Sequence, residues 1–118
     1  MWYVLSELGA DRKSLLINIG GGVVTDLVCF VVSTFMRGID FINVFTSLLA
    51  MVDASVGGKT GVDLGALKNL IGVINNPLGV VVDIRFLATL PAEELRSGMA
   101  EMFKHGLISS SEYWQQMC

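Results

Sequence analysis

Cysteine, proline and positive charge are all scarce in this chain. Its two cysteines, Cys29 and Cys118, form neither a disulfide framework nor a metal-ligand spacing, so a reducing cytoplasm is the expected compartment. The eight lysines and arginines form no basic run and the net charge is −3. This argues against a nucleic-acid partner, because neutralising phosphates requires clustered cations. The first residues also lack the basic start and apolar run of a secretion signal.

Long uncharged apolar runs are missing as well. The best candidate, Leu15 to Met36, contains Asp26 and three successive glycines. A central aspartate costs about 2.5 to 3.5 kcal/mol on membrane-insertion scales, whereas buried strands of a soluble parallel sheet give the same hydropathy. We therefore expect no membrane span. With 118 residues, 53% of them hydrophobic, and thirteen glycines, the chain has the size of one α/β domain and is too short for a two-domain enzyme.

Strand and helix patterns alternate along the chain. Three short apolar runs have the composition of buried strands, at residues 15–19, 41–45 and 79–83. Helices are expected over 2–9, from the glycines at 20–22 to about Arg37, from Thr46, and from Pro91, which takes the first helical position ahead of Glu93 and Glu94. The glycine density falls after Pro91, which indicates a change of domain there. The fold class is therefore α/β.

Three glycines join the first strand to the second helix. A strand, a glycine turn and a helix together point the N–H groups of the helix N-terminus at a pyrophosphate. The dinucleotide fingerprint would require a glycine at position 25, where this chain has Thr25. On these residues alone, a tight turn without a ligand remains an equal alternative.

The stretch from Asp53 to Ile71 contains many residues of the types that bind ligands. It holds two lysines, Asn69 and four glycines, a combination that forms an anion pocket from backbone N–H and ammonium groups. A nucleoside-triphosphate phosphate loop is excluded, because that motif needs a glycine at the position of Asp53. The plain structural alternative is a helix N-cap at Asp53 and two surface lysines, Lys59 and Lys68.

The last helix carries Glu101, Lys104 and His105, whose spacing puts all three on one side. From spacing alone, Glu101 and His105 fit two ligands of one zinc ion. A helix-surface pair is the commoner explanation of the same spacing, and both remain open here.

Four motifs together resemble 3-dehydroquinate synthase, a member of the sugar-phosphate cyclases. They are Gly-Gly-Gly-Val-Val-x-Asp-Leu from Gly20, the stretch from Asp53 to Gly72, Phe-Leu-x-Thr-Leu-Pro from Phe86, and Gly-x-Ala-Glu-x-x-Lys-His-Gly from Gly98. The resemblance covers nearly all 118 residues. It departs from the family at Val28 and Cys29, where smaller residues are usual, and at Phe45 and Ser47, where the family has Pro and Thr. Cys29 is not expected to act as a nucleophile, because its apolar helix raises the pKa of the thiol.

The resemblance implies two domains. Residues 1–90 would form the later half of a Rossmann-like NAD-binding α/β domain, and residues 91–118 the start of an all-α metal and substrate domain, with the active site in the cleft between them. It also implies that the chain is a fragment. The family's two other metal ligands are histidines further downstream, so little or no activity is expected from these residues alone.

The resemblance also assigns roles to residues. Lys59 and Lys104 would be catalytic, and Glu101 would bind Zn²⁺ or Co²⁺, whereas the residue at 105 is usually not a ligand. Substrate contacts would come from Arg37, Asp53, Lys59, Asn69 and Lys104. NAD contacts would come from Gly21, Gly22, Val23, Val24, Thr25, Asp26, Thr46, Ser47, Lys59, Lys68, Phe86, Leu87, Ala88 and Thr89. Arg37 would reach the substrate phosphate, in one arrangement across a homodimer interface; otherwise it is a cation that stabilises a helix end.

The implied reaction converts 3-deoxy-D-arabino-heptulosonate 7-phosphate to 3-dehydroquinate and phosphate, in the shikimate pathway of aromatic amino acid biosynthesis. NAD is reduced and regenerated within the cycle, and the metal polarises the hydroxyl group that is oxidised. Three alternatives remain: a cyclase that makes an inosose or a valiolone, an iron-dependent or glycerol-type alcohol dehydrogenase, and a non-catalytic nucleotide-binding remnant. The alcohol dehydrogenases share the glycine turn but lack the pattern from Asp53 to Asn69.

Overall fold

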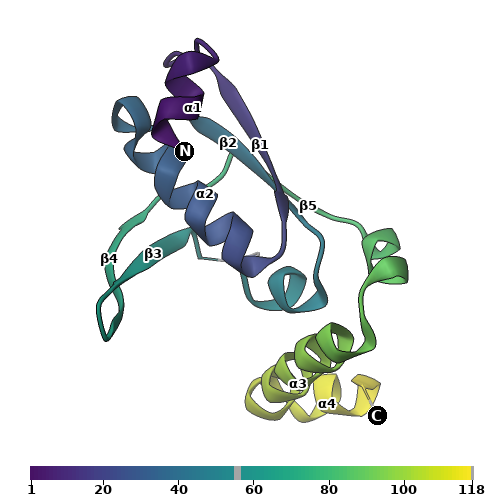
Figure 1. Cartoon of the computed structure of the whole chain (residues 1–118). Helices are drawn as coiled ribbons and strands as arrows, with labels where there is room; N and C mark the ends of the chain where they lie inside the picture. The colour runs from purple at the N-terminus through teal and green to yellow at the C-terminus, as the bar shows by residue number, and fades with distance from the viewer. Residues whose placement is uncertain (55–56, 118) are drawn as a thin grey trace.

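The computed structural model describes residues 1–54 and 57–117, and Figure 1 shows the arrangement of their helices and strands. In chain order the elements are α1 (Trp2–Glu7), β1 (Leu15–Gly20), α2 (Gly22–Thr34), the 3₁₀ turn η1 (Phe35–Arg37), β2 (Asp40–Phe45), the π-helical turn η2 (Ala50–Ala54), β3 (Lys59–Leu64), β4 (Leu67–Ile74), β5 (Gly79–Val82), the 3₁₀ helix η3 (Ile84–Thr89), α3 (Ala92–Ser109) and α4 (Ser111–Met117).

The centre of the molecule is a parallel sheet with strand order β1-β2-β5. Helix α2 covers one face of it (Figure 1). The core between helix and sheet is formed by Val28, Val32, Phe35, Ile39 and Phe41. The α/β class and all three predicted strands are confirmed, because apolar runs ending at glycine or turn signals are typical of strands in a parallel sheet.

The first glycine turn sets the start of α2. Gly21 has extended backbone angles and precedes the first helical residue, Gly22. The side chain of Thr25 is buried and donates hydrogen bonds back to the carbonyl oxygens of Gly21, at 3.1 Å, and Gly22, at 2.9 Å. Thr25 therefore closes the turn from inside, in the position where the dinucleotide fingerprint has its third glycine.

The far end of α2 differs from the sequence prediction. The helix was expected to run to about Arg37, but it ends at Thr34. Met36 and Arg37 have φ values of 49° and 71°, in the left-handed region that ends an α-helix, and Gly38 continues the reversal with φ 110°. Helix periodicity alone did not reveal this turn, because both residues have ordinary helical propensity.

An antiparallel hairpin, β3–β4, projects beside α2 and was not predicted from the sequence (Figure 1). Its strands pair closely because Gly61 faces Gly72 in register. A Cβ atom on Gly72 would overlap the Thr60 carbonyl oxygen and lie 3.0 Å from Gly61 Cα. The Thr60 hydroxyl donates to the Asp26 carbonyl oxygen at 2.7 Å and fixes the hairpin to α2.

Helix α3 packs against the segment that follows β2. Gly98 is buried there, and a Cβ atom on it would lie 2.6 Å from Leu48 Cβ and 2.8 Å from the Leu49 backbone nitrogen. The close approach therefore depends on a residue without a side chain. The predicted helix after Pro91 is confirmed, although it begins at Ala92, with Pro91 just before it.

Among residues 1–54 and 57–117, none of the helices combines the length and apolarity needed to cross a membrane.

Candidate functional site

A cavity of about 440 Å³ opens between α2, β2 and the segment that leads into the hairpin. Four of the predicted site residues line it: Thr25, Asp26, Asp53 and Lys59. They come from three separate stretches of the chain. The structure thus brings the glycine-turn helix and the lysine-bearing stretch to one cavity.

A second cavity of about 450 Å³ lies between α2 and the hairpin and shares Asp26 and Lys59 with the first. It is also lined by Asn69. Asn69 has φ 51°, and its backbone N–H donates to the Asp63 carboxylate at 2.8 Å. Asparagine adopts this left-handed conformation more readily than most residues. Asp63 therefore helps to fix Asn69 on the wall of the cavity, a role that sequence reasoning missed.

The second predicted cofactor segment lies directly beside the glycine turn. The Thr46 N–H donates to the Gly20 carbonyl oxygen at 3.0 Å, and a Cβ atom on Gly21 would lie 3.3 Å from the Ser47 hydroxyl. Ser47 caps the following helical turn by accepting from the Ala50 N–H at 3.3 Å. Ser47 thus fills the N-cap role, and Asp53 lies in the last part of η2 rather than at a helix start.

The start of α2 is open to a ligand. Among residues 1–54 and 57–117, a Cβ atom on Gly22 would meet nothing within 4 Å beyond its chain neighbours and its own helix backbone, and Val23 is 86% exposed. The first N–H groups of an α-helix have no partner within the helix and carry partial positive charge. The arrangement therefore fits a pyrophosphate group, as NAD contains.

Electrostatics in the cavity are dominated by acids. Partial burial, together with the neighbouring Asp53 carboxylate, raises the pKa of Asp26. Burial also raises the pKa of the Cys29 thiol, as expected from its apolar helix. Lys59 is the cation on the same wall.

Two buried asparagines at the first cavity, of which Asn43 is part of the lining, were missed by sequence reasoning. Asn18 donates to the Asn43 side-chain oxygen at 3.0 Å and to the Thr25 carbonyl oxygen at 3.3 Å. Asn43 and the Cys29 thiol lie 3.5 Å apart. The available signal was an asparagine inside each of two otherwise apolar strands. Because a buried amide is costly without partners, such residues indicate a polar network under a site.

Helix α3 carries a further acidic residue, Glu101, close to the acids of the first cavity. Glu101, 18% exposed, forms an ion pair with Lys104, and His105 Nε2 lies 3.5 Å from Glu101 Oε1. Ligand atoms of Asp53, Glu101 and His105 all lie within 4.8 Å of one another. The Glu101 carboxylate, and more weakly that of Asp53, raise the pKa of Lys104. Asp53 is therefore the residue that links the first cavity to α3.

The donor set of this cluster fits a transition metal such as Zn²⁺ or Co²⁺. Such ions take carboxylate oxygen and imidazole nitrogen as ligands. His105 Nε2 is buried and has no hydrogen-bond partner among the described residues.

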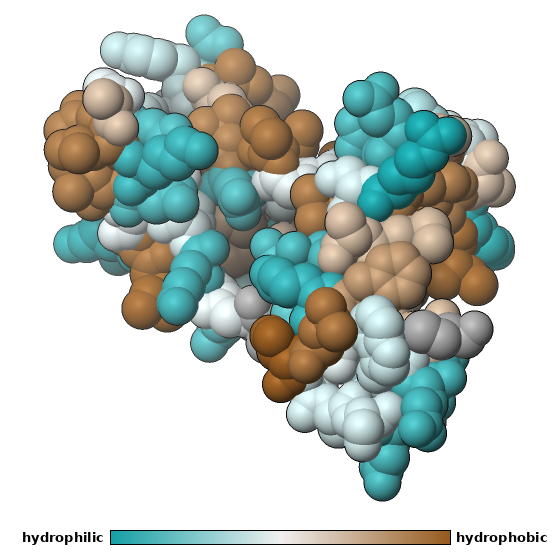
Figure 2. Space-filling model, turned by 90° about the horizontal axis from the view of Figure 1, so that it is seen from below, coloured by the Kyte–Doolittle hydropathy of each residue, from teal (hydrophilic) through white to brown (hydrophobic). Residues whose placement is uncertain are grey.

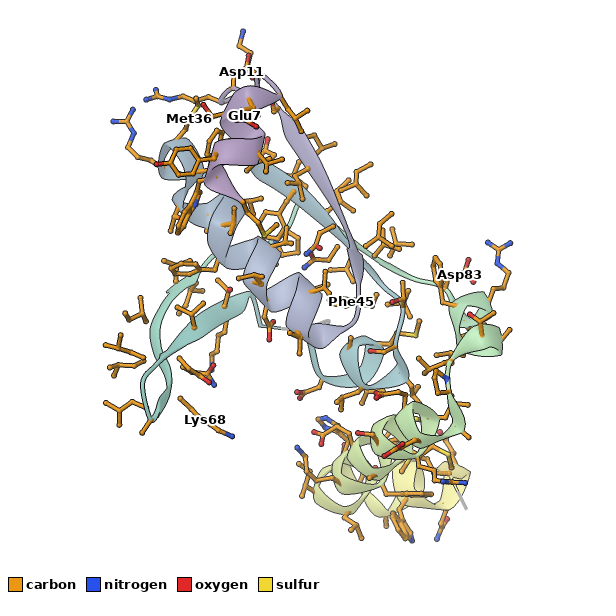
Figure 3. All side chains as sticks on the ribbon, in the orientation of Figure 1. Glu7, Asp11, Met36, Phe45, Lys68 and Asp83 are labelled. Atoms are coloured by element: carbon orange, nitrogen blue, oxygen red, sulfur yellow. The ribbon has the colours of Figure 1, made fainter. Side chains whose placement is uncertain are left out.

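Other predicted residues lie elsewhere in the chain. Arg37 lines a separate cavity of about 380 Å³ with Ser33 and Asp40. Lys68 lines neither of the first two cavities, and Figure 3 shows it projecting from the tip of the hairpin on the side where α3 lies. Met36, beside Arg37, lies at the opposite end of α2 from the glycine turn (Figure 3). Within this chain, Arg37 and Lys68 are therefore not brought to the cavity that holds Asp53 and Lys59.

The segment Phe86–Thr89 lies in η3, just after Asp83 at the end of β5 (Figure 3). Leu87 packs against the buried cluster of Phe45, Ala50 and Met51. Seen from below, the surface is hollowed between the hairpin side and the α3–α4 side of the molecule (Figure 2).

Known proteins match this chain closely in sequence. The family model described as 3-dehydroquinate synthase N-terminal matches residues 1–97. The 3-dehydroquinate synthase of Sulfolobus acidocaldarius is 51% identical over 111 residues, and that of Parabacteroides distasonis is 54% identical over 112 residues. These matches cover 94% and 95% of this chain but 31% and 32% of the relatives, so the chain spans about a third of their length.

Solved structures show the same similarity. The 2-epi-5-epi-valiolone synthase of Streptomyces hygroscopicus subsp. jinggangensis, with NAD⁺ and Zn²⁺ bound, superposes with a TM-score of 0.89 at 35% identity, over 94% of this chain and 31% of that one. A 2-deoxy-scyllo-inosose synthase complexed with carbaglucose-6-phosphate, NAD⁺ and Co²⁺ superposes with a TM-score of 0.87 at 32% identity, over 92% of this chain and 30% of that one.

Proposed function

Because this chain belongs to the 3-dehydroquinate synthase family, we propose that it forms the NAD-binding part and the first metal-binding helix of a 3-dehydroquinate synthase. The reaction is the conversion of 3-deoxy-D-arabino-heptulosonate 7-phosphate to 3-dehydroquinate and phosphate, and its place is the cytoplasm. Residues 1–90 belong to the nucleotide domain and residues 91–118 to the helical domain. The observation that carries the proposal is that Asp26 of α2, Asp53 and Lys59 line one cavity, while the Asp53 carboxylate also lies within 4.8 Å of the Glu101 carboxylate.

The glycine turn and its neighbours bind the dinucleotide. The N–H groups at the start of α2 hold the pyrophosphate, and Gly22 allows it to approach because no side chain of the described residues fills the space beside its Cα. Asp26 accepts hydrogen bonds from hydroxyl groups, and Ser47 lies next to the turn. When bound, NAD accepts and returns a hydride, and a divalent metal polarises the hydroxyl group that loses it.

Charged side chains bind and orient the sugar acid phosphate. Lys59 offers an ammonium group at the cavity wall, and Asn69 offers an amide from the hairpin. Lys104 is a cation at neutral pH and the Glu101 and Asp53 carboxylates raise its pKa further, so it holds an anionic substrate electrostatically. Asp53 accepts hydrogen bonds from substrate hydroxyl groups.

Arg37 requires a second copy of the chain in this proposal. It lines a cavity apart from the one that holds Lys59. In a homodimer, the Arg37 guanidinium of one copy would bind the phosphate in the site of the other, where its planar fork suits a phosphate group.

Binding of NAD tests the nucleotide part of the proposal. A Cβ atom at position 22 would have no atom of the other described residues within 4 Å outside its own helix backbone, so we expect Gly22→Val to fold yet obstruct the pyrophosphate. We expect its NAD affinity, measured by calorimetry, to fall at least about tenfold, since the backbone can no longer approach the ligand. Gly79→Ala, also in open space, is the matched control. Unchanged NAD binding in Gly22→Val would contradict the assignment.

A second candidate is another sugar-phosphate cyclase, because the two superposed structures make valiolone and inosose products. The higher identity to 3-dehydroquinate synthases, 51% and 54% against 35% and 32%, favours the first candidate. Phosphate release by the whole protein from the heptulosonate phosphate, compared with release from other sugar phosphates, distinguishes the two.

A further inference from the structure

Asn75 lines the first cavity, yet the proposed function gives it no role. It follows β4 directly and is half-buried. We propose that Asn75 is a positioning residue for Lys59, because it ties the glycine before Lys59 to helix α2. The inference rests on the proposed function in that Lys59 binds the substrate, and it goes further by naming the contacts that hold this lysine in place.

Two hydrogen bonds of Asn75 join segments that are far apart in the chain. Its backbone N–H donates to the Gly58 carbonyl oxygen at 2.8 Å. Its side-chain amide donates to the Ser33 hydroxyl oxygen at 2.9 Å, across 42 positions of the sequence. Ser33 belongs to the last turn of α2. Asn75 therefore connects the segment before β3 with the helix that carries the cavity residue Asp26.

The backbone at Gly58 fits closely against the turn that contains Asn75. Gly58 has φ 57°, in the left-handed region that glycine adopts without steric cost. A Cβ atom on it would overlap the Asn76 side-chain oxygen and lie 3.2 Å from the Asn75 carbonyl oxygen. Both asparagines line the same cavity as Lys59. The path of the chain into Lys59 is therefore set by this turn.

Lys59 is anchored on both sides. Thr60, the next residue, is buried and donates its hydroxyl group to the Asp26 carbonyl oxygen at 2.7 Å. Gly58, the preceding residue, is held by Asn75, so both anchors lead to α2. Because lysine has a flexible four-carbon stem, a fixed backbone limits the region that its ammonium group can reach. A misplacement of about 1 Å at a reacting site can lower the rate about 100-fold.

Asn75 is also shared between two cavities. Among residues 1–54 and 57–117, it is the only one that lines both the cavity of Lys59 and the cavity of Arg37. Its hydrogen-bond partner Ser33 lines the second of these as well. A substitution of Asn75 could therefore act through Arg37 as well as through Lys59, and a test has to separate the two routes.

A double-variant cycle on the whole protein makes this separation. Asn75→Leu keeps the backbone N–H and roughly the volume of the side chain but loses the amide that contacts Ser33. We expect kcat/KM for phosphate release from the heptulosonate phosphate to fall about tenfold, because the position of Lys59 is partly lost. In a Lys59→Ala background, the same substitution should change kcat/KM by less than about twofold, since the side chain that it positions is gone. Phosphate release with enzyme in excess over substrate extends the measurement to the slow variants.

Ser14→Ala is the matched control. It removes a comparable side-chain hydrogen bond, to Asp11 at 3.1 Å, outside the three cavities, and should leave kcat/KM unchanged. Ser33→Ala removes the Asn75 contact from the side of α2 and should lower kcat/KM as Asn75→Leu does. It takes the place of Asn75→Leu in the cycle if that variant does not fold.

An equal loss of kcat/KM with and without the Lys59 side chain would show that Asn75 acts on the fold or through Arg37. That result overturns the inference while the proposed function stands. Unchanged kcat/KM in Asn75→Leu and Ser33→Ala overturns it as well. If Lys59→Ala alone leaves kcat/KM unchanged, the role of Lys59 in the proposed function is wrong, and the inference falls with it.

Discussion

Gly98→Ala is the substitution that best tests how the structure assembles its site. The added methyl group would lie 2.6 Å from Leu48 Cβ and Cγ and 2.8 Å from the Leu49 backbone nitrogen. Carbon atoms in contact are normally about 3.5 to 4.0 Å apart. Because Leu49 contributes backbone, rotation of a side chain cannot relieve the overlap, and α3 must move by roughly 1 Å.

Two effects of opposite sign determine the change in stability. Alanine improves helix propensity over glycine by about 0.8 to 1.0 kcal/mol. Overpacking of a close contact costs about 1 to 3 kcal/mol. We therefore expect Gly98→Ala to lower the free energy of unfolding by about 1 kcal/mol, although alanine is the better helix former. The movement of α3 also displaces Glu101, the metal ligand of the proposed function, so Zn²⁺ affinity should fall at least about tenfold, since such sites tolerate displacements of only about 0.5 Å.

Urea unfolding, followed by circular dichroism, measures the first quantity, and calorimetry with Zn²⁺ measures the second. Gly79→Ala is the control, because within the described part of the chain a Cβ atom there would have no contact within 4 Å apart from its chain neighbours, and it should change stability by less than about 0.5 kcal/mol. A Gly98→Ala chain that is about 1 kcal/mol more stable, with unaltered metal affinity, would refute the close packing of α3 on Leu48 and Leu49.

Two further predictions concern the cavity and the hairpin. The folded-state pKa of Asp26 is raised above its ordinary value of 3.8. The stability that protonated Asp26 contributes is therefore fully present below pH 3.8 and is lost as the pH rises through the folded-state pKa. Asp26→Asn should therefore gain stability relative to the parent chain as the pH is raised, by less than about 1 kcal/mol because the site is partly exposed. Urea unfolding at several pH values checks this. A difference in unfolding free energy between variant and parent that does not change with pH would contradict it. Gly72→Ala should lower the free energy of unfolding by about 1 to 3 kcal/mol, because its methyl group would meet the Thr60 carbonyl group and Gly61 across the hairpin. An unchanged unfolding midpoint would show that β3 and β4 are not packed closely at this position.

Local sequence patterns were sufficient for most of the secondary structure. The apolar runs at 15–19, 41–45 and 79–83 predicted β1, β2 and β5, and the glycines predicted the turn before α2. Such patterns depend on residues close together in the chain, so periodicity and turn chemistry reveal them. The hairpin escaped prediction because its strands carry glycines at Gly61 and Gly72, which are poor strand formers by propensity. These glycines allow the two strands to approach closely, an effect that appears only when the strands are paired.

The sequence by itself determined the inventory of this protein: a glycine turn, a lysine-bearing stretch, and a helix with Glu101, Lys104 and His105 on one side. Only the tertiary structure decided which of these meet. It placed Asp53 beside Glu101 through the contact at Gly98, and it left Arg37 at the other end of α2. The reason is that contacts between distant segments depend on how closely two elements can pack, and a single hydrogen in place of a methyl group decides that distance.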